Sequence, residues 1–158
     1  MAGLTRDYNP FANLDLHIPV AYWEDVKQYT TTQGGAGDTS EQSSPFLRYV
    51  DLWAAAIAIG AEEGAYVSVS GAEQHRFHTG QVLQGDLVRI EFLQLVAIAH
   101  SKDPFVVTQP SKVIEIADAY AAGGLPILIE WLGGGVQTPM VSVTKKMIHY
   151  LAEKTPSQ

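Results

Sequence analysis

Hydrophobic residues recur at helical spacing through most of the chain. The first helical segment carries apolar side chains every three or four positions, at Phe46, Val50, Trp53 and Ile57. The hydroxyl of Ser43 or Ser44 can cap this helix. Pro45 suits the first turn, because proline has no N–H and the amides of the first turn have no acceptor within the helix. Gly60 and Gly64 indicate its end. The pattern therefore predicts one helix that buries a single apolar face.

Four further helices follow from the same pattern and from glycine and proline punctuation. The predicted segments are a helix from Asp86 to Ile98, one from Pro110 to a stop at Gly123–Gly124, a short one from Pro126 to Leu132 that Gly133–Gly135 closes, and one from about Val143 to Lys154. The helix from Asp86 to Ile98 is apolar on nearly every side, which is typical of a central helix. Residues 65–70 alternate at period two and are consistent with a short strand.

Aromatic residues concentrate near the start of the chain. Tyr8, Tyr22 and Trp23 lie in residues 1–32, which we interpret as an ordered arm that packs on the helices or binds a partner. Residues 33–44 are rich in Thr, Gly, Ser and Gln and are predicted to be a flexible loop. Residues 45–158 form the predicted helical domain. The expected fold is mainly α: a compact single-domain bundle of about five helices with an aromatic arm and at most a short strand pair.

The composition of the chain limits the classes of protein to which it can belong. The chain has 158 residues, of which 46% are hydrophobic, so it is long enough for one core. It has no cysteine, which excludes disulfides and thiolate sites, and no apolar run approaches the length of a membrane span. We expect a cytoplasmic protein with no membrane partner. The net charge of -7 repels nucleic acid unless folding gathers a local basic patch.

Acidic residues near two helix starts offer a site for catalysis. Asp51, Asp86 and Glu91 are the candidate catalytic residues, because paired carboxylates can hold Mg²⁺ or Mn²⁺ for phosphodiester cleavage. The alternative is structural. Asp86 then caps its helix, and Arg89 pairs with Asp51 or Glu91, since charges near a core are usually paired.

Two histidines three residues apart are the candidate metal ligands. On one helical turn His75 and His78 could bind a metal together with Glu73 or Asp86. The alternative is a solvated loop, because no third ligand is fixed by the sequence. Neither glycine run has the flanking signature of a phosphate loop, and no nucleophile elbow is present, which disfavours acyl transfer.

Basic residues are thinly spread, and a nucleic-acid surface would need several of them together. The candidate residues for contact with DNA are Arg48, Arg76, Arg89, Lys145 and Lys146. Only the two lysines are adjacent in the chain. Folding, a homo-oligomer or a partner would have to bring the others together.

Three segments resemble small proteins encoded beside bacterial DNA phosphorothioation systems. The similar segments are residues 46–60, 89–95 and 124–130, and the resemblance covers roughly residues 45 to 151. Such systems replace a non-bridging phosphate oxygen with sulfur to mark self DNA, and their small components are associated with nicked DNA. The resemblance implies a DNA-facing protein, a metal-dependent nickase being one form, that acts with sulfur-transfer and ATP-using proteins of the same system. No nuclease motif can be matched residue by residue.

Two hypotheses from different classes follow. The first is a component of a DNA modification and phage-defence complex that acts on duplex DNA, with the acids around a metal as a nickase. The second is a non-catalytic adaptor or oligomeric scaffold, whose aromatic arm and apolar helices bind partner proteins. The first needs the arginines and acids at one accessible site, whereas the second does not.

Overall fold

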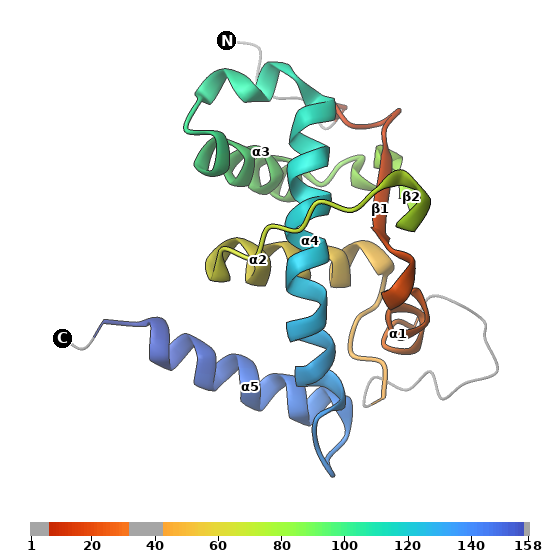
Figure 1. The fold of residues 1–158 in the computed structure, drawn as a ribbon, viewed down its shortest axis with the longest axis vertical. Coiled ribbons are helices and arrows are strands. Elements are labelled where there is room, and N and C mark those ends of the chain that lie inside the picture. Colours follow the sequence, from red (N-terminus) through yellow and green to blue (C-terminus); the bar gives the residue numbers. More distant parts are fainter. Residues whose placement is uncertain (1–6, 32–42, 157–158) are drawn as a thin grey trace.

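A long central helix organises the molecule. The computed structural model describes residues 7–31 and 43–156. Helix α4 (Pro110–Gly133) runs through the middle, and α3 (Leu87–Ser101), α2 (Tyr49–Glu63) and α5 (Pro139–Lys154) cross it at successive levels (Figure 1). The prediction of a mainly α fold with a short strand pair is confirmed.

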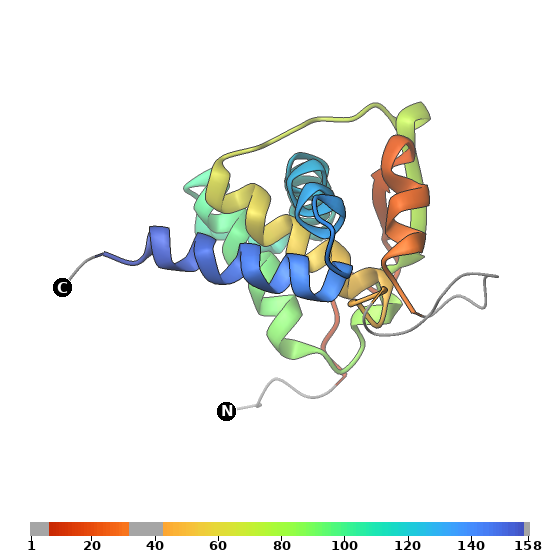
Figure 2. The ribbon, with the colours of Figure 1, turned by 90° about the horizontal axis from the view of Figure 1, so that it is seen from below.

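A small sheet and a short helix lie on the other side of α4. They are β1 (Asp15–Pro19), β2 (Gln74–Thr79) and α1 (Trp23–Gln28), which the view along α4 separates from the crossing helices (Figure 2). The strands are antiparallel, and their register shifts between Leu16 and His17. Short 3-10 turns connect the elements at Val20–Tyr22, Gly71–Glu73, Gly80–Leu83 and Pro104–Thr108.

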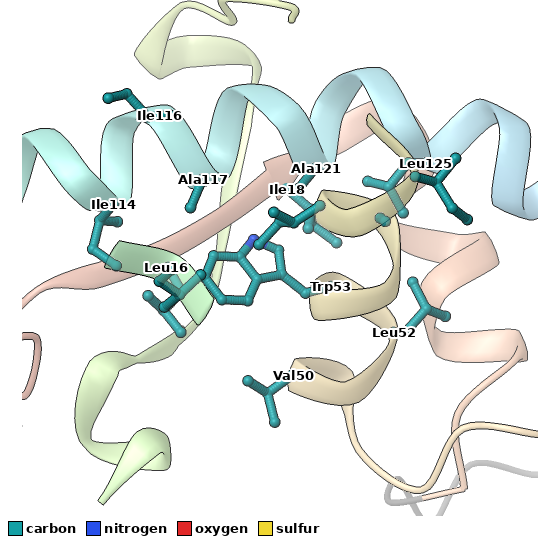
Figure 3. Close-up of a cluster of buried hydrophobic side chains, with 14 of the residues drawn as sticks. Leu16, Ile18, Val50, Leu52, Trp53, Ile114, Ile116, Ala117, Ala121 and Leu125 are labelled. Carbon is teal, nitrogen blue, oxygen red and sulfur yellow. The ribbon is translucent and has the colours of Figure 1, made fainter. Parts of the chain in front are cut away.

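The core lies where α2, α4 and β1 meet. Trp53 projects from α2 into this space, with Leu16 and Ile18 of β1 beside its indole and Ala117 of α4 above it (Figure 3). Trp53 is 1% exposed, which confirms its prediction as a core residue. Full burial of an aromatic side chain of this size contributes about 3 kcal/mol. Trp131 is only partly buried and packs against the core from α4.

The first predicted helix begins later than expected. The backbone of Arg48 is extended, and α2 starts at Tyr49 rather than at Pro45. The residues before it are instead bound to the end of α1: the amide of Phe46 donates to the carbonyl of Tyr29, and the hydroxyl of Ser44 donates to the carbonyl of Gln28. These tertiary hydrogen bonds outweigh the local preference of a Ser-Pro pair for a helix start.

The predicted stop at Gly123–Gly124 is wrong, because α4 continues through both glycines and through Pro126. The two glycines allow close approach of neighbouring backbone. A Cβ on Gly124 would overlap the carbonyl of Ala56 and lie 2.8 Å from the amide nitrogen of Gly60, and a Cβ on Gly123 would overlap the carbonyl of Ala65. Tight packing against α2 and the following segment therefore retains a glycine pair inside a helix. The predicted end at Gly133–Gly135 is confirmed.

The alternating segment 65–70 is not a strand. It crosses α4 without regular structure, tied by a hydrogen bond from the amide of Val67 to the carbonyl of Ala119. The second strand follows it, at Gln74–Thr79, where β1 supplies the partner. The left-handed residue that ends α2 is Gly64, with φ 65°, whereas Gly60 lies inside the helix. Of the predicted loop, residues 33–42 lie outside the described residues.

Candidate functional site

Most of the predicted catalytic and DNA-contacting residues meet where α2 and α3 begin. Arg89 spans the two helices, with Nη2 2.7 Å from Oδ1 of Asp51 and Nη1 2.9 Å from Oδ2 of Asp86. Arg48 approaches Asp51 from the other side, with Nη2 3.2 Å from Oδ1. We call these four residues, Arg48, Asp51, Asp86 and Arg89, the arginine–aspartate network. Folding thus brings together residues that are up to 41 positions apart in the sequence.

Each carboxylate of the network also satisfies backbone at a helix start. Oδ2 of Asp51 accepts from the amide of Arg48 at 2.9 Å, and Oδ1 of Asp86 accepts from the amide of Arg89 at 3.1 Å. Asp86 is therefore the cap of α3, as the sequence indicates. Both oxygens of both carboxylates accept hydrogen bonds from amides or guanidinium groups. The network carries two positive and two negative charges, so it is neutral as a unit.

The remaining predicted catalytic and basic residues lie apart from the network. Glu91 is exposed on α3 and, in the described part of the chain, forms no ion pair or hydrogen bond with the basic residues of the network. Arg76 lies on β2, where Nη1 is 3.4 Å from Oδ1 of Asp15. Lys145 and Lys146 are exposed on α5 and take part in no ion pair among the described residues. The structure therefore unites Arg48 with Arg89 and leaves the other basic residues on separate elements.

The two candidate metal ligands lie on a strand and not on a helical turn. His75 is half-buried and stacks on Trp23, with ring centroids 4.2 Å apart. His78 is exposed, and its Nδ1 accepts from the amide of Thr79 at 2.9 Å. The ring of His75 is thus engaged by Trp23 and that of His78 by the neighbouring Thr79. Within residues 7–31 and 43–156, no three His, Asp or Glu side chains are grouped as metal ligands.

The aromatic residues of the arm are largely used within the molecule. Trp23 packs between His75 and Tyr49, the latter with ring centroids 5.0 Å away. Tyr8 is at the surface, and its hydroxyl accepts from Nε2 of Gln94 at 3.1 Å. Tyr22 is partly buried against the core. All three residues therefore contact other parts of the same chain, and Tyr8 is the most exposed of them.

A second polar site, which was not predicted from the sequence, lies between β1 and α4. Asp118 is only 7% exposed. Its Oδ1 accepts from the backbone amide of His17 at 3.0 Å, and its Oδ2 lies 3.1 Å from Nδ1 of the same residue. The pair borders a cavity of about 420 Å³ whose other polar lining includes Ser68, Ser111 and Glu115. Because Nδ1 is engaged, Nε2 is the nitrogen of His17 that remains for a further contact.

Burial and hydrogen bonding act on this pair in opposite directions. The hydrogen bond to Asp118 raises the pKa of His17, more strongly than partial burial lowers it. Burial raises the pKa of Asp118, and the two donors of His17 work against that rise. The nearby indole N–H of Trp53 also lowers the pKa of Asp118. This N–H is buried, and its geometry toward the carboxylate is too poor for a hydrogen bond. The arrangement anchors β1 on α4 and holds an imidazole at a fixed position beside the cavity.

One signal in the sequence could have indicated this site. Asp118 is the one carboxylate in the otherwise apolar run from Ile116 to Leu125, and a charge on a buried helix face requires a partner. The identity of the partner could not be read, because His17 is 101 residues away in the chain. Only the packing of β1 on α4 supplies that contact.

Comparisons with known proteins assign the chain to a system without assigning a reaction. Residues 36–157 match a family model described as DNA sulphur modification system-associated protein 4. No curated protein and no solved structure matches the chain. In the described part of the chain, no helix has the length and apolar character needed to cross a membrane.

Proposed function

The chain belongs to the family of DNA sulphur modification system-associated protein 4, and we propose that it is a non-catalytic component that joins other proteins of that system. In this proposal its connection with duplex DNA comes through those proteins. The observation that carries it is the arginine–aspartate network. Its four carboxylate oxygens are already accepting hydrogen bonds, so they serve to join two helix starts.

A nickase would need the opposite arrangement. Mg²⁺ or Mn²⁺ is held through carboxylate oxygens and water, and the oxygens of Asp51 and Asp86 face guanidinium and amide donors instead. Release of these donors would leave Arg89 without partners at a site where its side chain is only 25% exposed. An unpaired guanidinium at such a partly buried position destabilises the folded state. The geometry therefore favours the adaptor over the metal-dependent nickase.

The outer face of α3 supports the adaptor. Val88 is 79% exposed and Leu95 is 64% exposed, and both stand on one side of the helix with the partly buried Phe92 between them. A surface helix usually presents polar residues to solvent. Apolar anchors at a spacing of four and three residues are typical of a helix face that binds another protein. We propose that this face binds a protein of the same modification system.

Co-purification tests the adaptor proposal. The full chain is expressed with a tag together with the other proteins of its system, and the amount of each that remains bound is quantified. We expect Val88→Asp with Leu95→Asp to reduce retention of one system protein at least about tenfold, because central apolar anchors contribute most of the energy of an interface. Val136→Asp is the matched control, since this fully exposed valine lies in the loop before α5. Equal retention with and without the α3 substitutions would refute the role of α3.

A nicking assay tests the rival function directly. Supercoiled plasmid is incubated with the protein and Mg²⁺ or Mn²⁺, and we expect no open-circular product above the protein-free control. Metal-dependent nicking that is lost in Glu91→Gln would overturn the proposal. This variant keeps the size of an exposed side chain outside the network, so a loss of activity could not be attributed to unfolding.

A further inference from the structure

The cavity beside His17 and Asp118 is bounded by β1 and by the first half of α4. Its volume is about 420 Å³, which is enough for a small molecule. Ser111, Glu115 and Asp118 line it from α4, and their spacing of four and three residues places them on one side of that helix. Asp15 and His17 line it from β1. The packing of β1 on α4 therefore creates a polar cavity as well as a core.

One ring nitrogen of His17 remains for a ligand in this cavity. Nδ1 lies 3.1 Å from the buried carboxylate of Asp118, which keeps the N–H of the neutral ring on Nδ1. Nε2 then carries the lone pair and accepts hydrogen bonds. The side chain of His17 is 28% exposed, so a molecule in the cavity can reach the ring. The pair thus fixes the position of an acceptor.

Two more exposed carboxylates add further acceptors to the lining. Oδ1 of Asp15 is paired with Arg76 at 3.4 Å, and the second oxygen of Asp15 has no partner among the described residues. Oε1 of Glu115 is paired with Lys112 at 2.9 Å, and its second oxygen is likewise unpartnered in the described part of the chain. The other polar side chains of the lining can both donate and accept: Asn13, Ser68, Gln74 and Ser111. A ligand that fills this cavity must therefore supply donors.

The same lining discriminates between classes of small ligand. Of the described residues, no lysine or arginine lines the cavity, so a phosphate or carboxylate would face carboxylates without a counter-charge. The described lining also has no phenylalanine, tyrosine or tryptophan, so a nucleobase would find no such ring to stack on. A hydroxyl group brings an acceptor with its donor, whereas an ammonium group brings three donors, no acceptor and a positive charge. The ammonium group matches this lining best.

We propose that this cavity binds a small primary amine in its ammonium form. The ammonium group donates to Nε2 of His17 and to the unpartnered oxygen of Glu115, and the carboxylate of Asp15 adds to the attraction from the β1 side. Asp118 is a positioning residue, because both of its oxygens already accept from His17. The site is distinct from the α3 face that we assign to another protein.

Titration of the full chain, labelled with ¹⁵N and followed by NMR, tests this site. The probe is putrescine (1,4-diaminobutane), and 1,4-butanediol, with hydroxyls in place of the amines, is the matched control. We expect putrescine to shift the amide signals of His17 and Asp118 and to bind at least about tenfold more tightly than the diol, because its hydrogen bonds are charge-assisted. Equal affinity of the two molecules, or no binding of putrescine, would refute the proposal.

Two variants with the same change in net charge separate this cavity from a general attraction to an acidic protein. Glu115→Gln should weaken putrescine binding about tenfold, because it removes one ionised acceptor from the site. Glu91→Gln should leave the affinity unchanged, since Glu91 is exposed on α3 and does not line the cavity. Both side chains are exposed, so circular dichroism should show an unchanged fold. Equal weakening in the two variants would overturn the assignment of the cavity.

The dependence of binding on pH tests the part of His17. The charged groups that act on its imidazole are Asp118 on α4, Asp15 on β1 and Arg76 on β2, and Glu115 lines the same cavity. Protonation makes Nε2 a donor and adds a like charge, and the pKa of His17 lies above 6.5. Putrescine affinity should therefore rise up to about tenfold from about pH 6 to about pH 8.5, where amines are still protonated. In His17→Gln the rise should disappear; a rise that persists, or none in the wild type, would exclude His17 from the site.

Discussion

The central helix α4 and the last helix α5 use apolar residues in different ways. Thirteen of the 24 residues of α4 are buried, against two of the 16 residues of α5. In α4 the apolar positions, two glycines and one carboxylate all contact other parts of the same chain. In α5 three apolar side chains, Val141, Ile148 and Leu151, remain exposed. The comparison separates residues that hold the fold together from residues that are available for association.

The largest effect is expected from Gly124→Ala in α4. The added Cβ would overlap the carbonyl of Ala56 and push α2 and α4 apart. A backbone overlap of this kind should lower the free energy of unfolding by about 4 kcal/mol, at the upper end for a single substitution. Urea denaturation followed by circular dichroism measures it. Gly71→Ala is the control, because no atom lies within 4 Å of its Cβ position; equal stability of the two variants would contradict the packing argument.

The next largest effect should come from Asp118→Ala, also in α4. The substitution removes the acceptor of both His17 donors and leaves a polar gap between β1 and α4. We expect a loss of about 3 kcal/mol in the free energy of unfolding, as for one partner removed from a buried pair. Glu115→Ala, an exposed carboxylate three residues earlier on the same helix, should cost little. A small loss in Asp118→Ala would show that the pair does not anchor β1.

A smaller effect is expected where α5 joins α4. The hydroxyl of Ser142 donates to the carbonyl of Trp131 at 2.7 Å and is buried at the base of α5. Ser142→Ala should lower the free energy of unfolding by about 1 kcal/mol, the typical contribution of one hydrogen bond. Thr144→Ala removes an exposed hydroxyl on the same helix and serves as the comparison. If both variants are as stable as wild type, α5 is held to α4 by apolar packing alone.

The smallest effect should appear as a dependence of stability on pH. The pKa of His17 is raised above its ordinary 6.5, so the folded state binds the proton more tightly than the unfolded state. The stabilisation is complete below pH 6.5 and is lost as pH rises through the folded pKa. The raised pKa of Asp118 acts in the same direction. We therefore expect a slightly lower melting temperature above this window than below it.

Two variants separate the source of this pH dependence. His17→Gln can still donate to Asp118 but does not titrate, so the decline in melting temperature above pH 6.5 should diminish. His149→Gln on α5 should leave the decline unchanged, because its pair with Glu153 is exposed and contributes little. A decline that persists in His17→Gln would place the titrating group elsewhere in the chain.

The features that could be predicted from the sequence are those that local chemistry controls. The cap at Asp86 and the helix end at Gly133–Gly135 were predicted, because a carboxylate that accepts from the amide three residues on, and a run of glycines, act within one turn. The pairing of Arg89 with Asp51 was one of the alternatives, and the structure has it. Sequence alone could not choose between this pairing and a metal site, since both require the same residues at the same helix starts.

The errors share one physical cause. A glycine pair has a strong local preference for helix ends, yet Gly123 and Gly124 lie within α4 because Ala56 and Ala65 approach so closely. The strand at Gln74–Thr79 depends on β1, which lies about 60 residues earlier. His17 and Asp118 are joined only through the same packing of β1 on α4. In each case a distant contact outweighed the local preference.

The sequence by itself determined that this chain forms amphipathic helices, where two of them are capped or stopped, and that arginines and aspartates occur near two helix starts. Only the tertiary structure decided that the arginines and aspartates form a closed neutral network, that a buried carboxylate binds a histidine beside a cavity, and that one face of α5 stays uncovered. The reason is that periodicity and capping act within a few residues, whereas the neutralisation of a charge and the covering of an apolar face depend on which distant segment packs there.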